Sequence, residues 1–253
     1  GDLSRQDIAA LVDKLADEYL RAVCRNEGQR TPRLLHLFAR LRRLSTLAAE
    51  NLVAEMAQSE FRPLFLEMDF TEKTPDAPGM LPVVLPSGVR VSLVGRADRV
   101  DVFREGEKTY LRVIDYKSGG KKFDLAAVEE GLSTQMLMYL FSLWRSENPR
   151  FRGKVAGAGE LLPAGLLYVG LMPDDKVYDS PAGAGDIREK ASSSLSRSGY
   201  FLRDERVLRA MDRELSGRYI PIRMTKDGGF QKNSLPSLAD LETLGAQVGK
   251  LQG

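Results

Sequence analysis

Cysteine and histidine are nearly absent from this sequence of 253 residues, which contains one of each, Cys24 and His36. One cysteine cannot form a disulfide within the chain, and such usage is typical of a reducing compartment, so we expect a cytoplasmic protein. Paired-cysteine redox and zinc sites are excluded, and no P-loop or GxSxG sequence occurs. Cys24 itself is interpreted as a small buried hydrophobic residue.

Long apolar runs and a strong net charge are absent as well. No run of about 18 apolar residues occurs, so we expect no membrane span. Residues 1–4 lack both a starting Met and the basic-then-apolar pattern of a signal peptide, which suggests a processed chain or an excised fragment. The formal net charge is only +2, so a DNA-binding surface would have to come from local clusters of basic side chains.

Two segments in the first half of the chain predict a β-hairpin. Residues 89–102 and 110–114 are rich in β-branched and apolar side chains, and the polar segment 104–108 between them contains glycine. Because side chains alternate along a strand, Asp115 and Lys117 should share one face, with Tyr116 on the other. Pairing within the hairpin can bring Asp98 beside Asp115.

Two carboxylates and a lysine at strand ends suit phosphodiester hydrolysis. Hard divalent cations such as Mg²⁺ prefer oxygen ligands, polarise phosphoryl oxygens and make bound water more acidic. The Lys117 ammonium can orient that water or stabilise developing negative charge. Taken alone, an Asp-x-Lys sequence is more often a solvated polar face. The apolar run before Asp115 and the glycine turn after Lys117 favour a site.

Three segments together carry a family resemblance. They read Gly95-x-x-Asp-Arg-Val-Asp101, Val113-Ile-Asp-Tyr-Lys-Ser-Gly119 and Gly131-Leu-x-x-Gln-x-x-x-Tyr-Leu140. They resemble the PD-(D/E)xK nuclease domain of the RecB type, most of all the C-terminal nuclease domain of the B subunit of AddAB (RexAB) helicase–nucleases. Residues 61–70, 163–168 and 207–212 are similar to flanking segments of that family, so the resemblance covers most of the chain.

The resemblance implies a restriction-endonuclease-like α/β fold, in which a mixed central sheet is flanked by helices. It implies one nuclease domain fragment over 1–253, with a helical N-terminal part (1–60), a nuclease core (61–172) and a C-terminal helical and hairpin extension (173–253). It further implies a Mg²⁺- or Mn²⁺-dependent deoxyribonuclease, exonucleolytic on single-stranded DNA tails. Such a domain would work with the A subunit of a bacterial helicase–nuclease in double-strand-break repair and recombination. The alternative is an inactive nuclease-like domain that binds DNA or a partner.

The resemblance also assigns roles to individual residues. Asp98, Asp115 and the carbonyl of Tyr116 would hold the metal, and Lys117 would be the catalytic lysine. Gln135 and Tyr139 would face the DNA and the active site; the alternative places Gln135 on the surface and Tyr139 in the core. An iron–sulfur cluster, which needs four cysteines in this family, is not expected in this fragment.

Basic residues offer two candidate contacts with the DNA backbone. The loop after Lys117 combines two glycines, Gly119 and Gly120, with Lys121 and Lys122, although a flexible turn is equally consistent with it. The predicted second helix carries four arginines, which either contact DNA phosphates or form a solvated face. They are Arg33, Arg40, Arg42 and Arg43.

His36, in the same predicted helix, is not assigned as a metal ligand, because the histidine of the family lies further upstream.

Periodicity and cap residues predict the remaining elements. An apolar helix face is expected at Ile8, Leu11, Leu15, Tyr19 and Val23. A buried stripe on the second helix is expected at Leu34, Leu37, Phe38, Leu41, Leu44 and Leu52. Glu67 should pair with Arg96 or Arg99, or support the metal site. In chain order we expect helices over 4–24 and 31–58, a strand over 63–70, a helix over 124–144, a long connection over 149–163, a buried strand over 164–172, weak signal over 173–198, a helix over 202–215, a small hairpin over 219–229 and a final helix opened by Ser237-x-x-Asp240.

Overall fold

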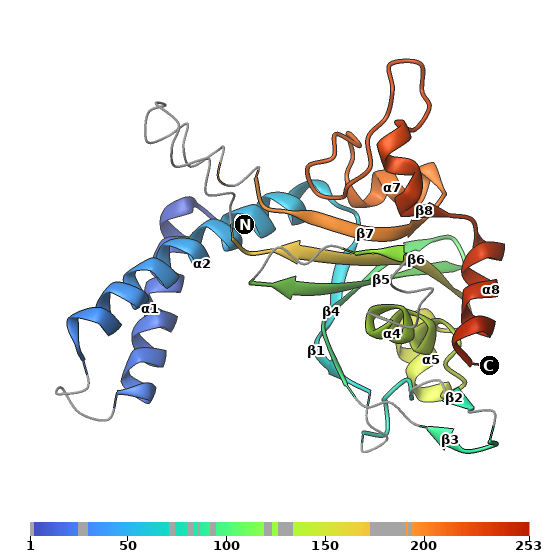
Figure 1. Cartoon of the computed structure of the whole chain (residues 1–253), viewed down its shortest axis with the longest axis horizontal. Helices are drawn as coiled ribbons and strands as arrows, with labels where there is room; N and C mark the ends of the chain where they lie inside the picture. Colours follow the sequence, from blue (N-terminus) through green and yellow to red (C-terminus); the bar gives the residue numbers. More distant parts are fainter. Residues whose placement is uncertain are drawn as a thin grey trace. The chain divides into compact units, whose positions relative to one another are not determined.

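The computed structural model describes residues 3–24, 30–70, 74–79, 83–84, 87–91, 95–118, 123–125, 134–172, 191 and 194–252 (Figure 1). Two compact units make up the chain: Gly1–Ala57 with Gly170–Ser196, and Gln58–Val169 with Arg197–Gly253. The division into three parts of one nuclease domain stays a prediction. Within the described residues, no helix combines the length and the apolar character that a bilayer span requires.

The first unit contains a pair of helices, α1 (Arg5–Val23) and α2 (Pro32–Gln58). The predicted capping box is confirmed, because the Ser4 hydroxyl accepts from the Asp7 N–H at 3.2 Å and the Asp7 carboxylate accepts from the Ser4 N–H at 3.0 Å. Thr31 caps α2 by accepting from the Leu34 N–H at 3.3 Å. Cys24 is buried, as predicted, in a small apolar cluster with Leu20 and Phe38.

Most of the predicted apolar face of α1 is exposed. Leu11, Leu15 and Tyr19 are 52%, 54% and 62% exposed, and only Ile8 among the predicted positions is buried. The buried stripe predicted on α2 is confirmed at Phe38 but wrong at Leu37 and Leu41, which are exposed. The other buried residues of α2 are Leu47, Asn51 and Glu55. Periodicity identifies the apolar face of a helix, but it does not show which helical turns on that face pack against another helix or strand.

The second unit is built on a mixed sheet, which confirms the predicted α/β class. Its six described strands are β1 (Arg62–Asp69), β4 (Arg96–Glu105), β5 (Lys108–Lys117), β6 (Glu160–Gly170), β7 (Arg197–Leu202) and β8 (Leu238–Ala239), in that spatial order. β1, β4 and β5 are antiparallel neighbours, as are β6 and β7, whereas β7 and β8 are parallel. Figure 1 shows β5 and β6 pointing the same way. A separate two-stranded sheet pairs β2 (Val83–Val84) with β3 (Arg90–Val91).

The predicted hairpin is confirmed and is tighter than expected. The ladder of β4 and β5 runs from Glu105↔Lys108 to Arg99↔Ile114, so only Gly106 and Glu107 form the turn. Gly106 has φ +58°, a conformation that glycine adopts without the steric cost of a side chain. This short turn fixes the register, and the register decides which side chains share a face.

The two faces of the hairpin are covered by different helices. α5 (Pro149–Ala156) lies on one face with α4 (Gln135–Trp144), and Arg104 donates to the Val155 carbonyl there at 2.8 Å (Figure 1). α7 (Glu205–Met211) covers the other face, where the Arg206 guanidinium lies 4.6 Å from the ring centroid of Phe103. We call these the front face, which carries Asp98, Asp115 and Lys117, and the back face, which carries Arg99, Asp101, Arg112 and Tyr116.

The predicted long connection over 149–163 is wrong, because it contains a helix and the start of a strand. Asn148 caps α5 by accepting from the Arg150 N–H at 3.0 Å, and Pro149 occupies the first turn. Phe151 and Val155, four residues apart, are buried. The predicted buried strand is confirmed, but β6 begins at Glu160 and continues through Pro163.

The C-terminal elements follow the predicted order with shifted ends. β7 occupies Arg197–Leu202, so the helix predicted from Leu202 begins only at Glu205, where Asp204 accepts from the Val207 N–H at 3.2 Å. The small hairpin is present as the bridges Ser216↔Arg223 and Met224↔Phe230. A 3-10 helix, η3 (Lys232–Ser237), and β8 then precede α8 (Leu241–Gln252). Asp240 rather than Ser237 caps α8, because its carboxylate accepts from the Thr243 N–H at 2.7 Å. Hydrogen bonds from the Thr243 side chain and then from its N–H lower the pKa of Asp240.

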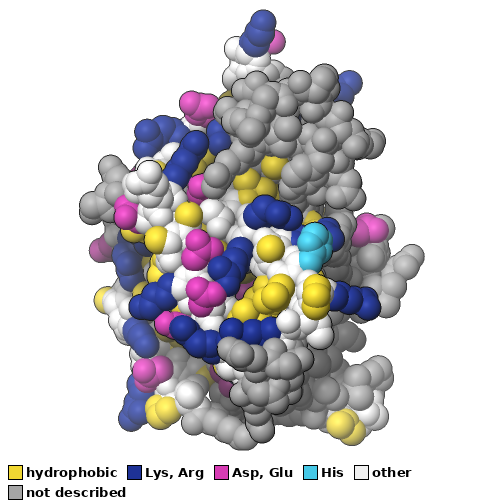
Figure 2. Space-filling model, turned by 90° about the vertical axis from the view of Figure 1, so that its left-hand side faces the viewer, with side chains coloured by type: hydrophobic (Ala, Val, Ile, Leu, Met, Phe, Trp, Pro, Cys, Tyr) yellow, Lys and Arg dark blue, Asp and Glu magenta, His cyan; other side chains and the backbone are white. Residues whose placement is uncertain are grey.

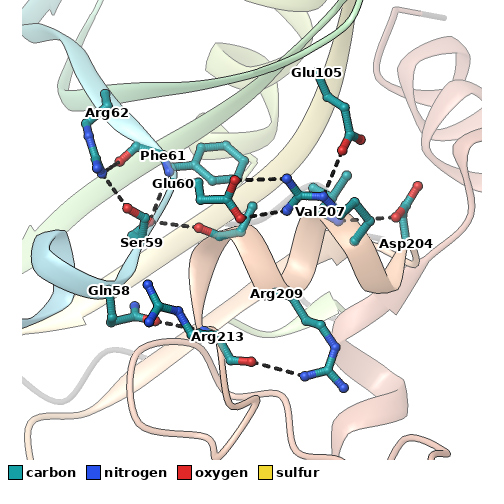
Figure 3. A network of polar contacts seen from close by, with 12 residues as sticks. Gln58, Ser59, Glu60, Phe61, Arg62, Glu105, Asp204, Val207, Arg209 and Arg213 are labelled. Carbon is teal, nitrogen blue, oxygen red and sulfur yellow. Dashed lines mark hydrogen bonds and ion pairs between the residues drawn. The ribbon is translucent and has the colours of Figure 1, made fainter.

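The segment Gln58–Arg62, which leads into β1, is tied to the end of α7 (Figure 3). The Gln58 amide and the Ser59 hydroxyl donate to the carbonyls of Met211 and Ala210 at 2.8 and 2.9 Å. Arg206 donates to both carboxylate oxygens of Glu60, at 2.7 and 2.8 Å, and to Glu105 at 2.7 Å. The guanidinium lowers the pKa of the Glu60 carboxyl. The first two bonds satisfy carbonyls at the helix end that have no partner within the helix.

Candidate active site

Asp98 is fixed at the point where the β4–β5 ladder ends. The last pair of the ladder is Arg99↔Ile114, and one further step in that register sets Asp98 opposite Asp115. Instead of a main-chain carbonyl, the Asp98 carboxylate accepts from the Tyr116 N–H, with Oδ2 at 2.7 Å from the nitrogen. Asp98 is half-buried, so its carboxylate remains partly open to solvent. The predicted proximity of Asp98 to the end of β5 is confirmed.

Asp115 and Lys117 project from the same face of β5, as strand alternation predicts. The Lys117 ammonium nitrogen lies 2.5 Å from Asp115 Oδ2, and the two side chains are 31% and 15% exposed. The pair is only partly exposed, and Asp115 Oδ2, the oxygen that faces the ammonium, is itself buried. The front face therefore combines two carboxylates and one ammonium within the last residues of a hairpin.

Tyr168 of β6 also belongs to this site, although the sequence did not predict it. The Lys117 ammonium lies 5.7 Å from the centroid of the Tyr168 ring, within the range of a cation–π contact. Burial, and secondarily the charge of Asp115, raise the pKa of Tyr168 to about 12. The phenol is therefore neutral at ordinary pH. The signal available in the sequence was a lone tyrosine in the apolar strand that follows the Gln135–Tyr139 helix.

Gln135 and Tyr139 share one face of α4, as their spacing predicts. The Gln135 side-chain amide donates to the Tyr139 hydroxyl at 2.6 Å. Gln135 is exposed, whereas Tyr139 is only 2% exposed and stacks on Phe70 at 4.6 Å between ring centroids. A Cβ on Gly95 would overlap the Tyr139 hydroxyl and lie 2.9 Å from Tyr139 Cζ. The glycine that opens the first motif therefore leaves room for the tyrosine of the third.

The predicted DNA-binding loop lies outside the described residues, as do Gly131 and Leu132 of the third motif. Gly119, Gly120, Lys121 and Lys122 are all in this group. The first described residue after the loop, Phe123, donates its N–H to the Ser198 hydroxyl at 2.8 Å and stacks on Tyr200 at 5.5 Å. The chain that follows the loop is thus anchored on β7.

The arginines of α2 divide into two groups. Arg42 forms ion pairs with Asp17 and, at 3.6 Å, with Asp13 of α1, so it stabilises the helix pair. Arg33, Arg40 and Arg43 are exposed. The histidine of the chain is likewise exposed, and Figure 2 shows it in cyan beside Lys and Arg side chains and apolar side chains.

Glu67 pairs with Arg96, the first of the two partners expected from the sequence. Glu67 Oε2 lies 3.3 Å from Arg96 Nη1, and the two side chains are 64% and 58% exposed. Such an exposed pair needs no metal to stabilise the carboxylate.

The oxygen ligands of the site suit a hard divalent cation. No group of three His, Cys, Asp or Glu side chains that could hold a metal occurs among the described residues. Mg²⁺, however, is commonly held by one or two carboxylates together with waters and substrate phosphates. Asp98 and Asp115 are two carboxylates at the open end of the hairpin, next to the Tyr116 main chain.

Comparison with known proteins identifies the family of the chain. A profile of the PD-(D/E)XK nuclease superfamily matches residues 1–236. The chain therefore belongs to the PD-(D/E)XK nuclease superfamily.

Among curated proteins, the chain is similar to the B subunit of the ATP-dependent helicase/deoxyribonuclease of Acetivibrio thermocellus (32% identity over 99% of this chain and 21% of that protein) and of Clostridium novyi (31%, 97% and 21%). The corresponding subunit of a Thermoanaerobacter species is 30% identical over 92% of this chain and 20% of that protein. The chain thus spans about a fifth of the length of these relatives.

Proposed function

We propose that this domain hydrolyses phosphodiester bonds of DNA with a divalent metal ion, Mg²⁺ or Mn²⁺, held by Asp98, Asp115 and the Tyr116 carbonyl. The observation that carries the proposal is the meeting of Asp98, Asp115 and Lys117 on one partly exposed face of the hairpin. When bound, the ion supplies polarisation of a phosphoryl oxygen and a more acidic water.

The residues of the chain divide the remaining work. The Tyr116 N–H holds the Asp98 carboxylate in place, and the ion pair with Lys117 orients Asp115. The Lys117 ammonium, a compact cation, can move a short distance to orient the attacking water or stabilise charge on the phosphate. The neutral Tyr168 ring lies against that ammonium and limits where it can go.

Recognition of DNA would involve side chains around this site. Gln135 is exposed, and its side-chain amide donates a hydrogen bond to the hydroxyl of the buried Tyr139. This hydrogen bond would hold the amide in one orientation for contact with a DNA strand. Lys121 and Lys122, with Gly119 and Gly120, would contact phosphates next to the metal. This assignment rests on their position in the sequence directly after Lys117.

The wider role follows from the relatives, whose names describe one subunit of a helicase/deoxyribonuclease. We propose that the domain acts in the same setting, on single-stranded tails exposed by a helicase, as an exonuclease in double-strand-break repair and recombination. Its partners would be DNA and an A subunit, in the bacterial cytoplasm.

The one cysteine, Cys24, is buried among apolar side chains, so the described residues offer no iron–sulfur site.

The test is cleavage of a linear single-stranded DNA by the purified chain with Mg²⁺ or Mn²⁺. Asp115→Ala and a chelator should each abolish cleavage, while circular dichroism and thermal unfolding of Asp115→Ala match wild type. Asp227→Ala, which removes an exposed aspartate of the C-terminal hairpin, is the matched control and should cleave normally.

Two results would contradict the proposal. Cleavage by Asp115→Ala at the wild-type rate would show that the nuclease site lies elsewhere. The inactive, DNA-binding alternative would be favoured if the wild-type chain and a longer chain both bind DNA but neither cleaves it with Mg²⁺ or Mn²⁺.

A further inference from the structure

A buried cluster of charged side chains lies directly behind the candidate active site. On the back face, Asp101 lies between two arginines: Arg99 Nε is 2.8 Å from Asp101 Oδ1, and Arg112 Nη2 is 2.6 Å from Asp101 Oδ2. The Arg99, Asp101 and Arg112 side chains are 3%, 1% and 1% exposed. We call these three residues the back-face cluster.

The hairpin itself assembles this cluster. The register places Asp101 directly opposite Arg112, and Arg99 is two residues from Asp101 on the same face of β4. The Arg112 guanidinium also lies 5.0 Å from the centroid of Phe61. Charges buried to this degree are costly to desolvate, and an apolar trio of similar volume would often be as stable. Stability alone therefore gives a weak reason for the cluster.

The cluster connects to the front face through one residue, Tyr116. Arg99 Nη1 donates to the Tyr116 hydroxyl at 2.6 Å, while another nitrogen of the same guanidinium, Nη2, donates to Asp101 at 2.9 Å. The main chain of Tyr116 faces the site, where its N–H donates to Asp98 at 2.7 Å. Hydrogen bonds therefore connect Asp101 to the Tyr116 hydroxyl on the back face and the Tyr116 N–H to Asp98 on the front face, and the covalent skeleton of Tyr116 joins the two.

We propose that the back-face cluster is a positioning device for the metal site, acting through Tyr116. Asp101 and Arg112 fix the Arg99 guanidinium, and Arg99 fixes the Tyr116 ring. The ring sets the main chain of Tyr116, whose N–H orients Asp98 and whose carbonyl is a proposed metal ligand. The consequence for catalysis rests on the proposed nuclease function; the mechanical link between Arg99 and Asp98 does not.

The test removes only the hydroxyl of Tyr116, in Tyr116→Phe. We expect amide hydrogen exchange at residue 116, followed by NMR, to become at least 10-fold faster, because the peptide unit is no longer held. Mn²⁺ affinity, measured by calorimetry, should fall roughly 10-fold, the lower end of the range for loss of a partner behind a metal ligand. The turnover number should fall with it, while the melting temperature changes little.

Tyr110→Phe is the matched control. Tyr110 lies on the same strand and the same face, is 4% exposed and stacks on Phe103. Loss of its hydroxyl should leave both exchange at residue 116 and Mn²⁺ affinity at wild-type values. Arg99→Lys keeps the positive charge but lacks the guanidinium that donates to Asp101 and Tyr116 at the same time. Its amide exchange at residue 116 and its Mn²⁺ affinity should resemble those of Tyr116→Phe.

The outcomes separate this inference from the proposed function. Unchanged exchange at residue 116 in Tyr116→Phe, or exchange that changes equally in Tyr110→Phe, would overturn the positioning role even if wild type cleaves DNA. Faster exchange with unchanged Mn²⁺ affinity would overturn the connection to the metal. If wild type neither binds Mn²⁺ nor cleaves, the proposed function fails, and selective loss of protection at residue 116 would still support the link to Asp98.

Discussion

The two faces of the β4–β5 hairpin carry the same kinds of side chain under opposite conditions. On the front face, Asp115 and Lys117 are 15% and 31% exposed. On the back face, Asp101 is 1% exposed and meets two guanidiniums. An aspartate whose oxygens already meet two arginines has little capacity left for a metal ion. The difference teaches that burial and neutralisation, not the identity of the residue, separate a candidate ligand such as Asp98 from a structural charge on the same strand.

The largest expected effects come from replacing one aspartate on each face. Asp98→Asn should lower DNA cleavage by more than about 100-fold, since loss of a mere partner of a ligand costs about 10- to 100-fold, and should leave the urea unfolding midpoint almost unchanged. Asp101→Asn, in contrast, should lower the free energy of unfolding by about 3–5 kcal/mol, because two buried arginines lose the carboxylate that neutralises them. Equal loss of stability in both variants would remove the distinction between the faces.

A smaller effect is expected where the front face meets α4. Gly95→Ala adds a methyl that overlaps the Tyr139 hydroxyl and should cost about 1–3 kcal/mol of unfolding free energy. Combining it with Tyr139→Phe should recover part of that cost, because the overlapping oxygen is gone. Gly153→Ala in α5, where an added Cβ meets nothing within 4 Å, is the control and should not destabilise. Strict additivity of Gly95→Ala and Tyr139→Phe would contradict the packing argument.

The smallest effect concerns the ring beside Lys117. Tyr168→Leu removes the cation–π contact and should lower the turnover number by roughly 3- to 30-fold, corresponding to about 0.5–2 kcal/mol. Tyr168→Phe keeps the ring and should stay within about 2-fold of wild type. Because the pKa of Tyr168 is raised to about 12, its phenol is neutral during assays, so Tyr168→Phe should not change the pH–rate profile between about pH 7 and 9. A Phe variant as slow as the Leu variant would assign the effect to the hydroxyl.

The hairpin was predictable because its determinants are local. Alternating side chains and a short glycine turn define a register, and the register places Asp98, Asp115 and Lys117 together. The hydrogen bond from the Tyr116 N–H to Asp98 was not predictable, since it depends on where the ladder ends. Spacing placed Gln135 and Tyr139 on one face of a helix but could not give the depth at which Tyr139 is buried.

Errors arose where burial depends on distant parts of the chain. The exposed Leu37 and Leu41 follow the same periodicity as the buried Phe38, and only the three-dimensional packing distinguishes them. Tyr168 was missed because the neighbour of β5 in the sheet is a strand more than forty residues later along the chain. The helix α5 was missed because basic residues and glycine obscured an Asn-Pro start.

The Gln58–Arg62 segment has a consequence for how the protein is made. Its contacts with α7 and with Arg213 just after it join residues 146 to 155 positions apart. At about 5–20 residues per second, a ribosome needs roughly 7–30 s to synthesise such a stretch. The hairpin that carries Asp98 and Asp115 therefore emerges long before β1 can be tied down at its start. During that time, the residues of the candidate active site would be present in the nascent chain, but the contacts between the Gln58–Arg62 segment and α7 would not yet have formed.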